Sequence, residues 1–253
     1  MTKQYPFIIE ENFKSSMLSE WSTEFANATP TNHVVLDNFL PDEHAEFISG
    51  KFPRPEHPVW LDWKKRSHYF YGKQGPGGSE KFNLLDPEFR FALNEFNSGY
   101  FLSFLERLTG IDKLIPDPYF LGGGMHQILS GGILDIHTDF NYYNRLDIYR
   151  QLNVLIYFTE DWKENYGGEL EFWDDSPKEG GTCVKSIAPI FNRAVIFKTD
   201  KTSFHGHPNE WAAPEPITRR SIALYYYTSQ KLEGFVYNRT TDFQDVVTKP
   251  LPK

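Results

Sequence analysis

The stretch "GGILDIHTD", residues 131–139, joins a glycine pair to an alternating apolar run and ends in a histidine and an aspartate. Other segments between residues 119 and 228 have the same form, short and rich in β-formers, and Gly, Pro, Asn and Asp turns divide them. They are "YFLGGGMHQIL", "RQLNVLIYFT", "GELEFWD", "TCVKSIAPI", "RAVIFKT" and "RRSIALYYYT". This rhythm predicts an antiparallel sandwich or barrel rather than parallel βαβ units. We expect a double-stranded β-helix (jelly roll), whose open mouth can gather side chains from distant strands.

The segments before this core predict flanking helices, so the expected class is mainly β with helices at its side. "HVVLDNFL" (33–40) indicates a strand, and "PDEHAEFISGKF" (41–52) a short helix. A second helix is expected to begin at Asp86 as N-cap, with Pro87 as its first residue, and to end near Gly110. Its buried stripe would consist of Phe89, Leu93, Phe96, Tyr100 and Phe104.

The length of 253 residues fits one large domain with an extension. Residues 1–32 are polar and mixed, and we expect them to form an N-terminal arm. Residues 33–253 would then form a single domain, with the jelly-roll core at about 119–228. The sequence does not indicate an oligomeric state.

The composition excludes several classes of protein. A net charge of −8 argues against a nucleic-acid-binding protein, which normally carries a basic stripe. The single cysteine, Cys183, excludes an intrachain disulfide framework and a thiolate zinc site. No segment has the length and apolar character of a membrane span or of a signal peptide. We therefore expect a soluble, cytoplasmic protein without a membrane partner.

The pair His137 and Asp139 at the end of a predicted strand is a candidate for two thirds of a metal site. A third ligand is available downstream in "TDKTSFHGHPNEW", which contains His205 and His207. Two imidazoles and one carboxylate on one face of a metal leave coordination positions open. That arrangement is typical of non-haem Fe(II) oxygenases and suits iron better than a closed structural zinc site. The ordinary alternative is a pair of polar residues at the end of a strand.

A second feature is the arginine at the start of "RRSIALYYYT". In a strand, Arg219, Ser221 and Ala223 would share one face, directed into the mouth of the barrel, and Arg220 would point the other way. A buried arginine holds a carboxylate through a bidentate pair, as a 2-oxoglutarate site requires. The alternative is a surface arginine pair at a strand start.

These motifs in their order resemble the Fe(II)/2-oxoglutarate-dependent dioxygenases, specifically the prolyl 4-hydroxylase-like branch. The resemblance covers about residues 119–228 and depends on four stretches of sequence. They are "HTD", "LNVLIYFTEDWKENYGGELEFWD", "AVIFKTDKTSFHGHP" and "RRSIALYYY". It implies a jelly roll that holds Fe(II) and uses 2-oxoglutarate as cosubstrate, with ascorbate as a stimulant of turnover.

The resemblance gives the role of metal ligands to His137, Asp139 and one of the two later histidines. We predict that His205 is the third ligand, because it follows "AVIFKTDKTS" where the ligand of the family normally lies. His207 precedes Pro208, which restricts its backbone to extended conformations and suggests an outgoing loop.

The same resemblance assigns the cosubstrate pocket. It gives Arg219 the far carboxylate of 2-oxoglutarate, and Tyr157 matches a tyrosine that commonly hydrogen-bonds that carboxylate. Leu170, after "YGG", matches an apolar residue of the pocket wall. Asn153 lies on the same alternating face as Tyr157, and Ser221 on the same face as Arg219.

The predicted function is hydroxylation of an unidentified substrate, with dioxygen as co-reactant and with release of succinate and CO2. A peptidyl proline, an amino acid or another small molecule would suit such a core. The competing hypothesis is a cupin-like metal-binding or isomerase protein without redox activity, which would have no use for Arg219 beside Tyr157. An inactive scaffold is disfavoured by the intact ligand set.

Substrate binding is predicted in residues 57–82, where Trp63, Arg66 and Tyr71 would combine aromatic faces with a cation. The glycine-rich end of this stretch, residues 73–79, could act as the hinge of a lid. The alternative is a strand pair with an ordinary surface loop.

Overall fold

The computed structural model describes residues 15–62, 69–231 and 239–247. The helices are α1 (Ser15–Asn27), α2 (Asp42–Lys51), α3 (Pro87–Glu95) and α4 (Gly99–Thr109). The strands are β1 (His33–Leu36), β2 (Leu61–Asp62), β3 (Lys73–Gly75), β4 (Ile115–Pro116), β5 (Gly124–Ile128), β6 (Leu134–Thr138), β7 (Tyr142–Tyr143), β8 (Ile148–Tyr157), β9 (Leu170–Trp173), β10 (Cys183–Ile187), β11 (Ala194–Lys198), β12 (Phe204–His207), β13 (Arg219–Thr228) and β14 (Asp242–Phe243). Within these residues, no helix has both the length and the apolar character needed to cross a bilayer.

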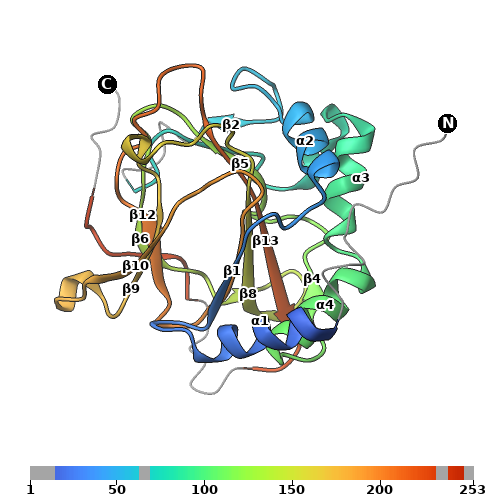
Figure 1. The fold of residues 1–253 in the computed structure, drawn as a ribbon, viewed down its shortest axis with the longest axis vertical. Coiled ribbons are helices and arrows are strands. Elements are labelled where there is room, and N and C mark those ends of the chain that lie inside the picture. The colour runs from blue at the N-terminus through green and yellow to red at the C-terminus, as the bar shows by residue number, and fades with distance from the viewer. Residues whose placement is uncertain (1–14, 63–68, 232–238, 248–253) are drawn as a thin grey trace.

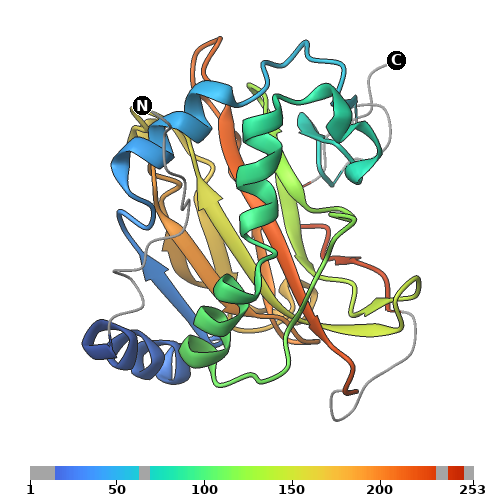
Figure 2. The same ribbon diagram turned by 90° about the vertical axis from the view of Figure 1, so that its right-hand side faces the viewer.

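Two antiparallel sheets face each other and enclose the centre of the molecule (Figure 1). The larger sheet has the order β1-β11-β8-β13-β5-β3-β2, and the smaller one has the order β10-β9-β12-β6-β14. The helices cover the outer face of the larger sheet, which Figure 2 shows from the helix side. The prediction of a mainly β fold with a jelly-roll core and flanking helices is confirmed.

Strand β13 shows how side-chain alternation divides the two faces of the larger sheet. Ile222 and Leu224 are buried in the apolar core beneath the helices. Arg219, Ser221 and Ala223 point the other way and line a cavity between the two sheets. The pleat of a strand sends successive side chains to opposite faces, so one strand serves both the packing of the fold and the lining of the cavity.

Phenylalanines of α3, of its C-cap and of α4 fill the core between the helices and the larger sheet. Phe89, Phe96, Phe101 and Phe104 are each at most 1% exposed. Burying a phenylalanine side chain contributes about 1.5–3 kcal/mol, so these four residues account for much of the attachment of the helices to the sheet.

The prediction of one continuous helix from Pro87 to near Gly110 is wrong. Helix α3 ends at Glu95, and α4 begins at Gly99, because the Ser98 hydroxyl accepts a hydrogen bond from the Phe101 amide at 3.3 Å and caps a new helix. The break changes the face that α4 buries, so Tyr100 is 47% exposed instead of lying in the core.

Segments on both sides of residues 119–228 add strands to the two sheets. Strand β3 pairs with β5 in the larger sheet, and β14 pairs with β6 in the smaller sheet. Within residues 1–32, helix α1 buries Leu18 and Phe25 against the same core as α4. Residues outside the predicted core at 119–228 therefore add strands toward the edges of both sheets.

Candidate metal centre and cosubstrate pocket

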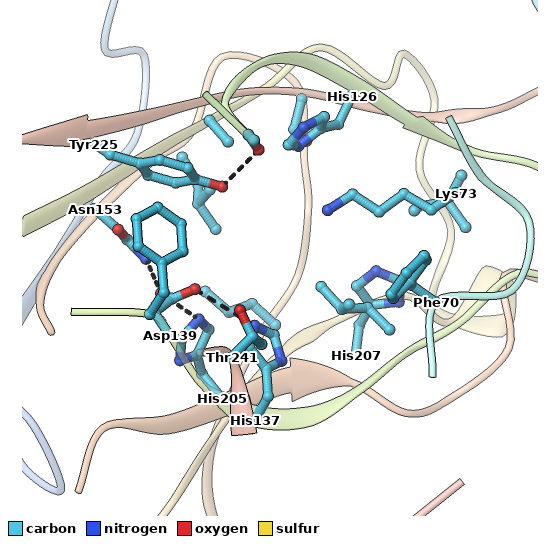
Figure 3. Close-up of a pocket in the computed structure, with 18 of the residues that line it drawn as sticks. Phe70, Lys73, His126, His137, Asp139, Asn153, His205, His207, Tyr225 and Thr241 are labelled. Atoms are coloured by element: carbon cyan, nitrogen blue, oxygen red, sulfur yellow. Dashed lines mark hydrogen bonds and ion pairs between the residues drawn. The ribbon is translucent and has the colours of Figure 1, made fainter. Parts of the chain in front are cut away.

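Three side chains from the smaller sheet meet at one end of the cavity (Figure 3). His137 on β6 and His205 on β12 are directly paired in the antiparallel register, and Asp139 follows the end of β6. The ligand atoms of the three residues all lie within 4.8 Å of one another. Nε2 of His205 is 3.4 Å from Asp139 Oδ2, and Nε2 of His137 is 3.8 Å from Asp139 Oδ1. The paired strands thus bring together residues that are far apart in the sequence.

Both histidines are oriented by the backbone. Nδ1 of His137 lies 2.7 Å from the Asp135 carbonyl oxygen, and Nδ1 of His205 lies 2.8 Å from the Ser203 carbonyl oxygen. A carbonyl can only accept a hydrogen bond, so each Nδ1 carries the proton and each Nε2 keeps its lone pair directed at the centre of the cluster.

The carboxylate of Asp139 is held in place by two residues of β8. The Asn153 side-chain amide donates to Asp139 Oδ2 at 2.8 Å, and Arg150 Nη2 lies 3.1 Å from the same oxygen. Arg150 also donates to Asn153 Oδ1 from Nε at 3.0 Å and from Nη2 at 2.6 Å. Its guanidinium lies 3.4 Å from the centroid of the Tyr225 ring, a stacked position that further fixes it.

Burial and charge set the protonation of this cluster. Burial, helped by the neighbouring His205, lowers the pKa of His137 to about 3. Burial alone would raise the pKa of Asp139, but the Arg150 guanidinium and the two histidines hold that pKa well below its usual range. Near neutral pH the cluster therefore offers a neutral imidazole and a carboxylate, the protonation states in which these side chains bind metals.

The donor set fits Fe(II). Two imidazole nitrogens and one carboxylate oxygen come from one side, and the open cavity lies on the other side. This arrangement leaves positions for a cosubstrate and for dioxygen, as the 2-His-1-carboxylate triad requires. His207 lines the same cavity but is not part of the three-residue cluster.

Arg219 lies buried in the cavity wall, with 5% of its surface exposed. Its Nε donates to the Gly168 carbonyl oxygen at 2.6 Å, and its Nη2 lies 3.5 Å from the Tyr157 hydroxyl. Among the described residues, no carboxylate lies within 4.0 Å of it as an ion-pair partner. A buried guanidinium without a counter-charge is costly, which fits a receptor for the carboxylate of a ligand.

Gly168 brings its backbone close to Arg219 because it has no side chain. Its φ is +75°, and an added Cβ would lie 2.8 Å from Trp211 and 3.0 Å from Arg219 Cδ. A larger residue would therefore both strain the turn and displace the arginine.

The structure places the other predicted cosubstrate residues in three different settings. Leu170 and Ser221 line the cavity. Tyr157 is fully buried and contacts Arg219 through its hydroxyl and its ring, whose centroid lies 5.0 Å from the guanidinium. Asn153 also lines the cavity, but its amide is engaged with Asp139 and Arg150, which points to a role at the metal end.

The residues predicted for substrate binding do not gather at the cavity in the part of the chain that is described. Trp63 and Arg66 lie outside the described residues. Tyr71 is absent from the cavity lining, and its carbonyl accepts a hydrogen bond from the Ile133 amide. Its neighbours Phe70 and Lys73 line the cavity instead.

The proposed hinge at residues 73–79 begins as a strand. Lys73–Gly75 form β3, which pairs with β2 and β5. Further along, the Ser79 amide donates to the Tyr119 carbonyl at 2.9 Å. Both ends of the stretch are thus held by backbone hydrogen bonds, and its action as a hinge stays a prediction.

The sequence reasoning missed several cavity residues, among them Lys73, Arg150 and Phe243. Phe243 on β14 stacks on Tyr69, with ring centroids 4.7 Å apart, and its ring lies 5.2 Å from that of His137. The short segment "TDFQD" around it has no strand pattern of its own. Arg150 lies in a strand that was predicted, but its inward orientation was not.

The sequence comparisons find a family model and a curated protein that are similar to this chain. A family model described as the 2OG-Fe(II) oxygenase superfamily matches residues 123–227. Prolyl 3-hydroxylase OGFOD1 of Mus musculus is 24% identical over 229 residues, which are 87% of this chain. The chain spans 38% of the length of that relative.

Solved structures of low sequence identity share the fold. A prolyl hydroxylase from Trichoplax adhaerens, in complex with a hypoxia inducible factor peptide fragment, has a TM-score of 0.54 at 19% identity, covering 83% of this chain and 90% of its own. HygX from Streptomyces hygroscopicus, with nickel, 2-oxoglutarate and hygromycin B bound, has a TM-score of 0.52 at 10% identity, covering 89% of this chain and 97% of its own. The viral collagen prolyl hydroxylase of Paramecium Bursaria Chlorella virus-1, in a 2OG complex, has a TM-score of 0.51 at 12% identity, covering 80% of this chain and 99% of its own.

The match to the family model spans β5 to β13, the strands that carry the three clustered ligands and Arg219. Together with the jelly-roll fold, it makes this chain similar to the 2OG-Fe(II) oxygenase superfamily over the residues that form the site, and similar in sequence to a prolyl 3-hydroxylase.

Proposed function

We propose that this protein is an Fe(II)- and 2-oxoglutarate-dependent hydroxylase. It would couple the conversion of 2-oxoglutarate to succinate and CO2 with hydroxylation of a C–H bond in a second substrate, using dioxygen. When bound, the iron supplies the activation of dioxygen that no amino-acid side chain provides.

One observation carries the proposal: a metal-binding cluster shares one cavity with an arginine that has no ion-pair partner among the described residues. The cavity has a volume of about 390 Å³, and its lining includes His137, Asp139, His205 and Arg219. That volume is within the range typical of small-molecule sites. A dicarboxylate with a 2-oxo group fits both ends, because one carboxylate pairs with the arginine and the 2-oxo acid end faces the metal ligands.

The residues of this chain would divide the work as follows. His137, Asp139 and His205 bind the metal, and Asn153 keeps the Asp139 carboxylate turned toward it. Arg219 orients the cosubstrate by its far carboxylate, with the Tyr157 hydroxyl beside it. Leu170 and Phe197 provide apolar walls, which keep water from the bound cosubstrate.

A peptide containing proline is the first substrate class to test. The proposal follows from the names of the relatives, a prolyl 3-hydroxylase and two prolyl hydroxylases. The lining of the cavity supports it, because Phe70, Phe140, Tyr225 and Phe243 offer aromatic surfaces for a prolyl ring. HygX, which has hygromycin B bound, makes small molecules the second class.

The experiment is an incubation of the purified protein with Fe(II), 2-oxoglutarate and air, with succinate as the readout. We expect succinate to form only when Fe(II) is added, and to increase when a true substrate is included. A set of prolyl peptides, screened for a gain of 16 Da, then identifies that substrate. Metal binding without any conversion or binding of 2-oxoglutarate would favour the cupin-like alternative.

A cytoplasmic location is part of the proposal. It is supported by the single cysteine, Cys183, which is exposed and unpaired, as is usual where thiols stay reduced. The net charge of −8 supports a substrate other than nucleic acid.

A further inference from the structure

Lys73 reaches into the cavity from the strand next to β5. Its backbone pairs with Ile128 on β5, and the side chains of both residues line the cavity. Figure 3 shows its nitrogen directed into the open centre, between His126 and His207 and toward the side that holds Asp139. The lysine begins the short strand β3, and its side chain points inward to the cavity.

Lys73 has no acceptor of its own in the described part of the chain. None of the ion pairs there includes it, and none of the side-chain hydrogen bonds has its ammonium as donor. Burial lowers the pKa of Lys73 to about 8, and the positive charges of Arg219 and Arg150 add to this effect. The attraction of the Asp139 carboxylate, which also pairs with Arg150, opposes this lowering of the pKa only in part.

The charges in the cavity do not balance. Of the described residues, its lining contains the cations Lys73, Arg150 and Arg219 and a single carboxylate, that of Asp139. Arg150 and Asp139 neutralise each other at 3.1 Å. The far carboxylate of 2-oxoglutarate would neutralise Arg219, and a divalent metal ion would add positive charge. Lys73 is then left as a cation that still needs an anion.

We infer that Lys73 is a second anion-binding residue of the cavity and that it binds a carboxylate group lying between the metal ligands and Arg219. The inference rests on the proposed function and deepens it, because it assigns Lys73 to a carboxylate other than the one that Arg219 binds. The carboxylate can come from two sources. One is the 2-oxo acid end of 2-oxoglutarate, and the other is an acidic group of the primary substrate.

Calorimetry distinguishes the sources in its first arm. The full-length protein is loaded with Mn(II), which takes the place of iron without turnover, and is titrated with 2-oxoglutarate. Lys73→Met keeps most of the side-chain volume and removes the charge. Lys81→Met is the matched control, because Lys81 is outside the cavity lining and donates to the Pro58 carbonyl. Melting temperatures establish that each variant is folded, and Lys73→Gln replaces the methionine variant if that one does not fold.

The second arm uses the complex with Mn(II) and saturating 2-oxoglutarate. N-acetylaspartate and its neutral amide, N-acetylasparagine, are added in turn, and paramagnetic relaxation of their protons by Mn(II) reports binding close to the metal. A substrate-derived carboxylate predicts that the wild type prefers N-acetylaspartate and that Lys73→Met loses this preference.

Removing a charge-assisted hydrogen bond should weaken binding about 10- to 100-fold. We expect a loss of this size in Lys73→Met for 2-oxoglutarate in the first arm or for N-acetylaspartate in the second, with Lys81→Met unchanged. Affinities within twofold of wild type for 2-oxoglutarate, together with no Lys73-dependent binding of N-acetylaspartate, overturn the inference. A wild-type protein that binds neither Mn(II) nor 2-oxoglutarate overturns the proposed function, and the inference with it.

Discussion

Replacing Arg219 with alanine should weaken the binding of 2-oxoglutarate far more than the binding of metal. Arg219 is 5% exposed, and among the described residues its side chain hydrogen-bonds to the Gly168 carbonyl and the Tyr157 hydroxyl but to no carboxylate, so it can pair with a ligand carboxylate. Truncating one partner of a buried, hydrogen-bonded charge pair costs about 2–5 kcal/mol. At 1.4 kcal/mol per factor of ten, the Kd of 2-oxoglutarate should rise roughly 30- to 4,000-fold.

The neighbouring arginine is the matched control for this variant. Arg220 points to the opposite face of β13, where its guanidinium lies 5.7 Å from the centroid of the Phe52 ring. Arg220→Ala should therefore leave the Kd of 2-oxoglutarate within a few-fold of wild type. Arg219→Lys keeps the charge but loses the planar fork, so its Kd should lie between those of the wild type and of the alanine variant.

The assay is calorimetric titration of the Mn(II)-loaded proteins with 2-oxoglutarate, with a separate titration of the apo-proteins with Mn(II). Equal losses of affinity for 2-oxoglutarate in Arg219→Ala and Arg220→Ala would show that the assigned faces of β13 do not govern cosubstrate binding. An unchanged Kd in Arg219→Ala would refute the role of the arginine altogether.

Three further outcomes follow from the geometry of the cavity. His205→Ala should abolish binding of one equivalent of Fe(II) or Mn(II) in equilibrium dialysis, whereas His207→Ala should retain it; the reverse order would move the third ligand to His207. Asn153→Ala, which frees the Asp139 carboxylate, should weaken metal binding about 10- to 100-fold in the same assay, and an unchanged affinity would deny it a positioning role. Burial holds the pKa of His126 well below its ordinary value of 6.5. Below pH 6.5 the unfolded chain therefore binds a proton at His126 that the folded protein does not bind. The free energy of unfolding of the apo-protein should therefore fall as the pH drops below about 6.5, by up to about 1.4 kcal/mol per pH unit for this group. His126→Gln should reduce that slope in urea melts between pH 6.5 and 5, and an identical slope would contradict the assignment.

The parts of the fold that depend on local pattern could be predicted from the sequence. Alternation along β13 predicted that Arg219, Ser221 and Ala223 share a face, and the structure places all three on the cavity. Period-two alternation is a property of a single strand, so it needs no knowledge of the strand's partners. Local signals also predicted α2, through Pro41 at its start and the acidic residues of its first turn, and its bounds of Asp42–Lys51 lie within the predicted helix.

Features that depend on the pairing of distant segments could not be predicted. On β8, alternation from Asn153 would turn Arg150 away from the cavity, but the pairing of β8 with β13 shifts register between Leu152 and Arg150. Such an irregularity changes the face of the sheet to which a side chain points, and the sequence of the strand itself does not reveal it. Arg150 consequently faces Asp139, where it bears on the metal site.

Strand length explains two other omissions. Strands β3 and β14 have only three and two residues, too few for an alternating pattern. Lys73 and Phe243 enter the cavity because these short strands extend existing sheets, through pairing with β5 and β6. The break between α3 and α4 had a local signal, the cap residue Ser98, but the continuous spacing of aromatic residues hid it.

The most direct test of the central claim is the fate of molecular oxygen during turnover. The wild-type protein is incubated with Fe(II), 2-oxoglutarate and ¹⁸O₂, and succinate is analysed by mass spectrometry. If His137, Asp139 and His205 hold the iron and Arg219 holds the cosubstrate in one cavity, succinate should carry one ¹⁸O atom. Its formation should require Fe(II) and disappear in His137→Ala. Succinate that lacks the label, or that forms equally well without iron or in His137→Ala, would contradict the account.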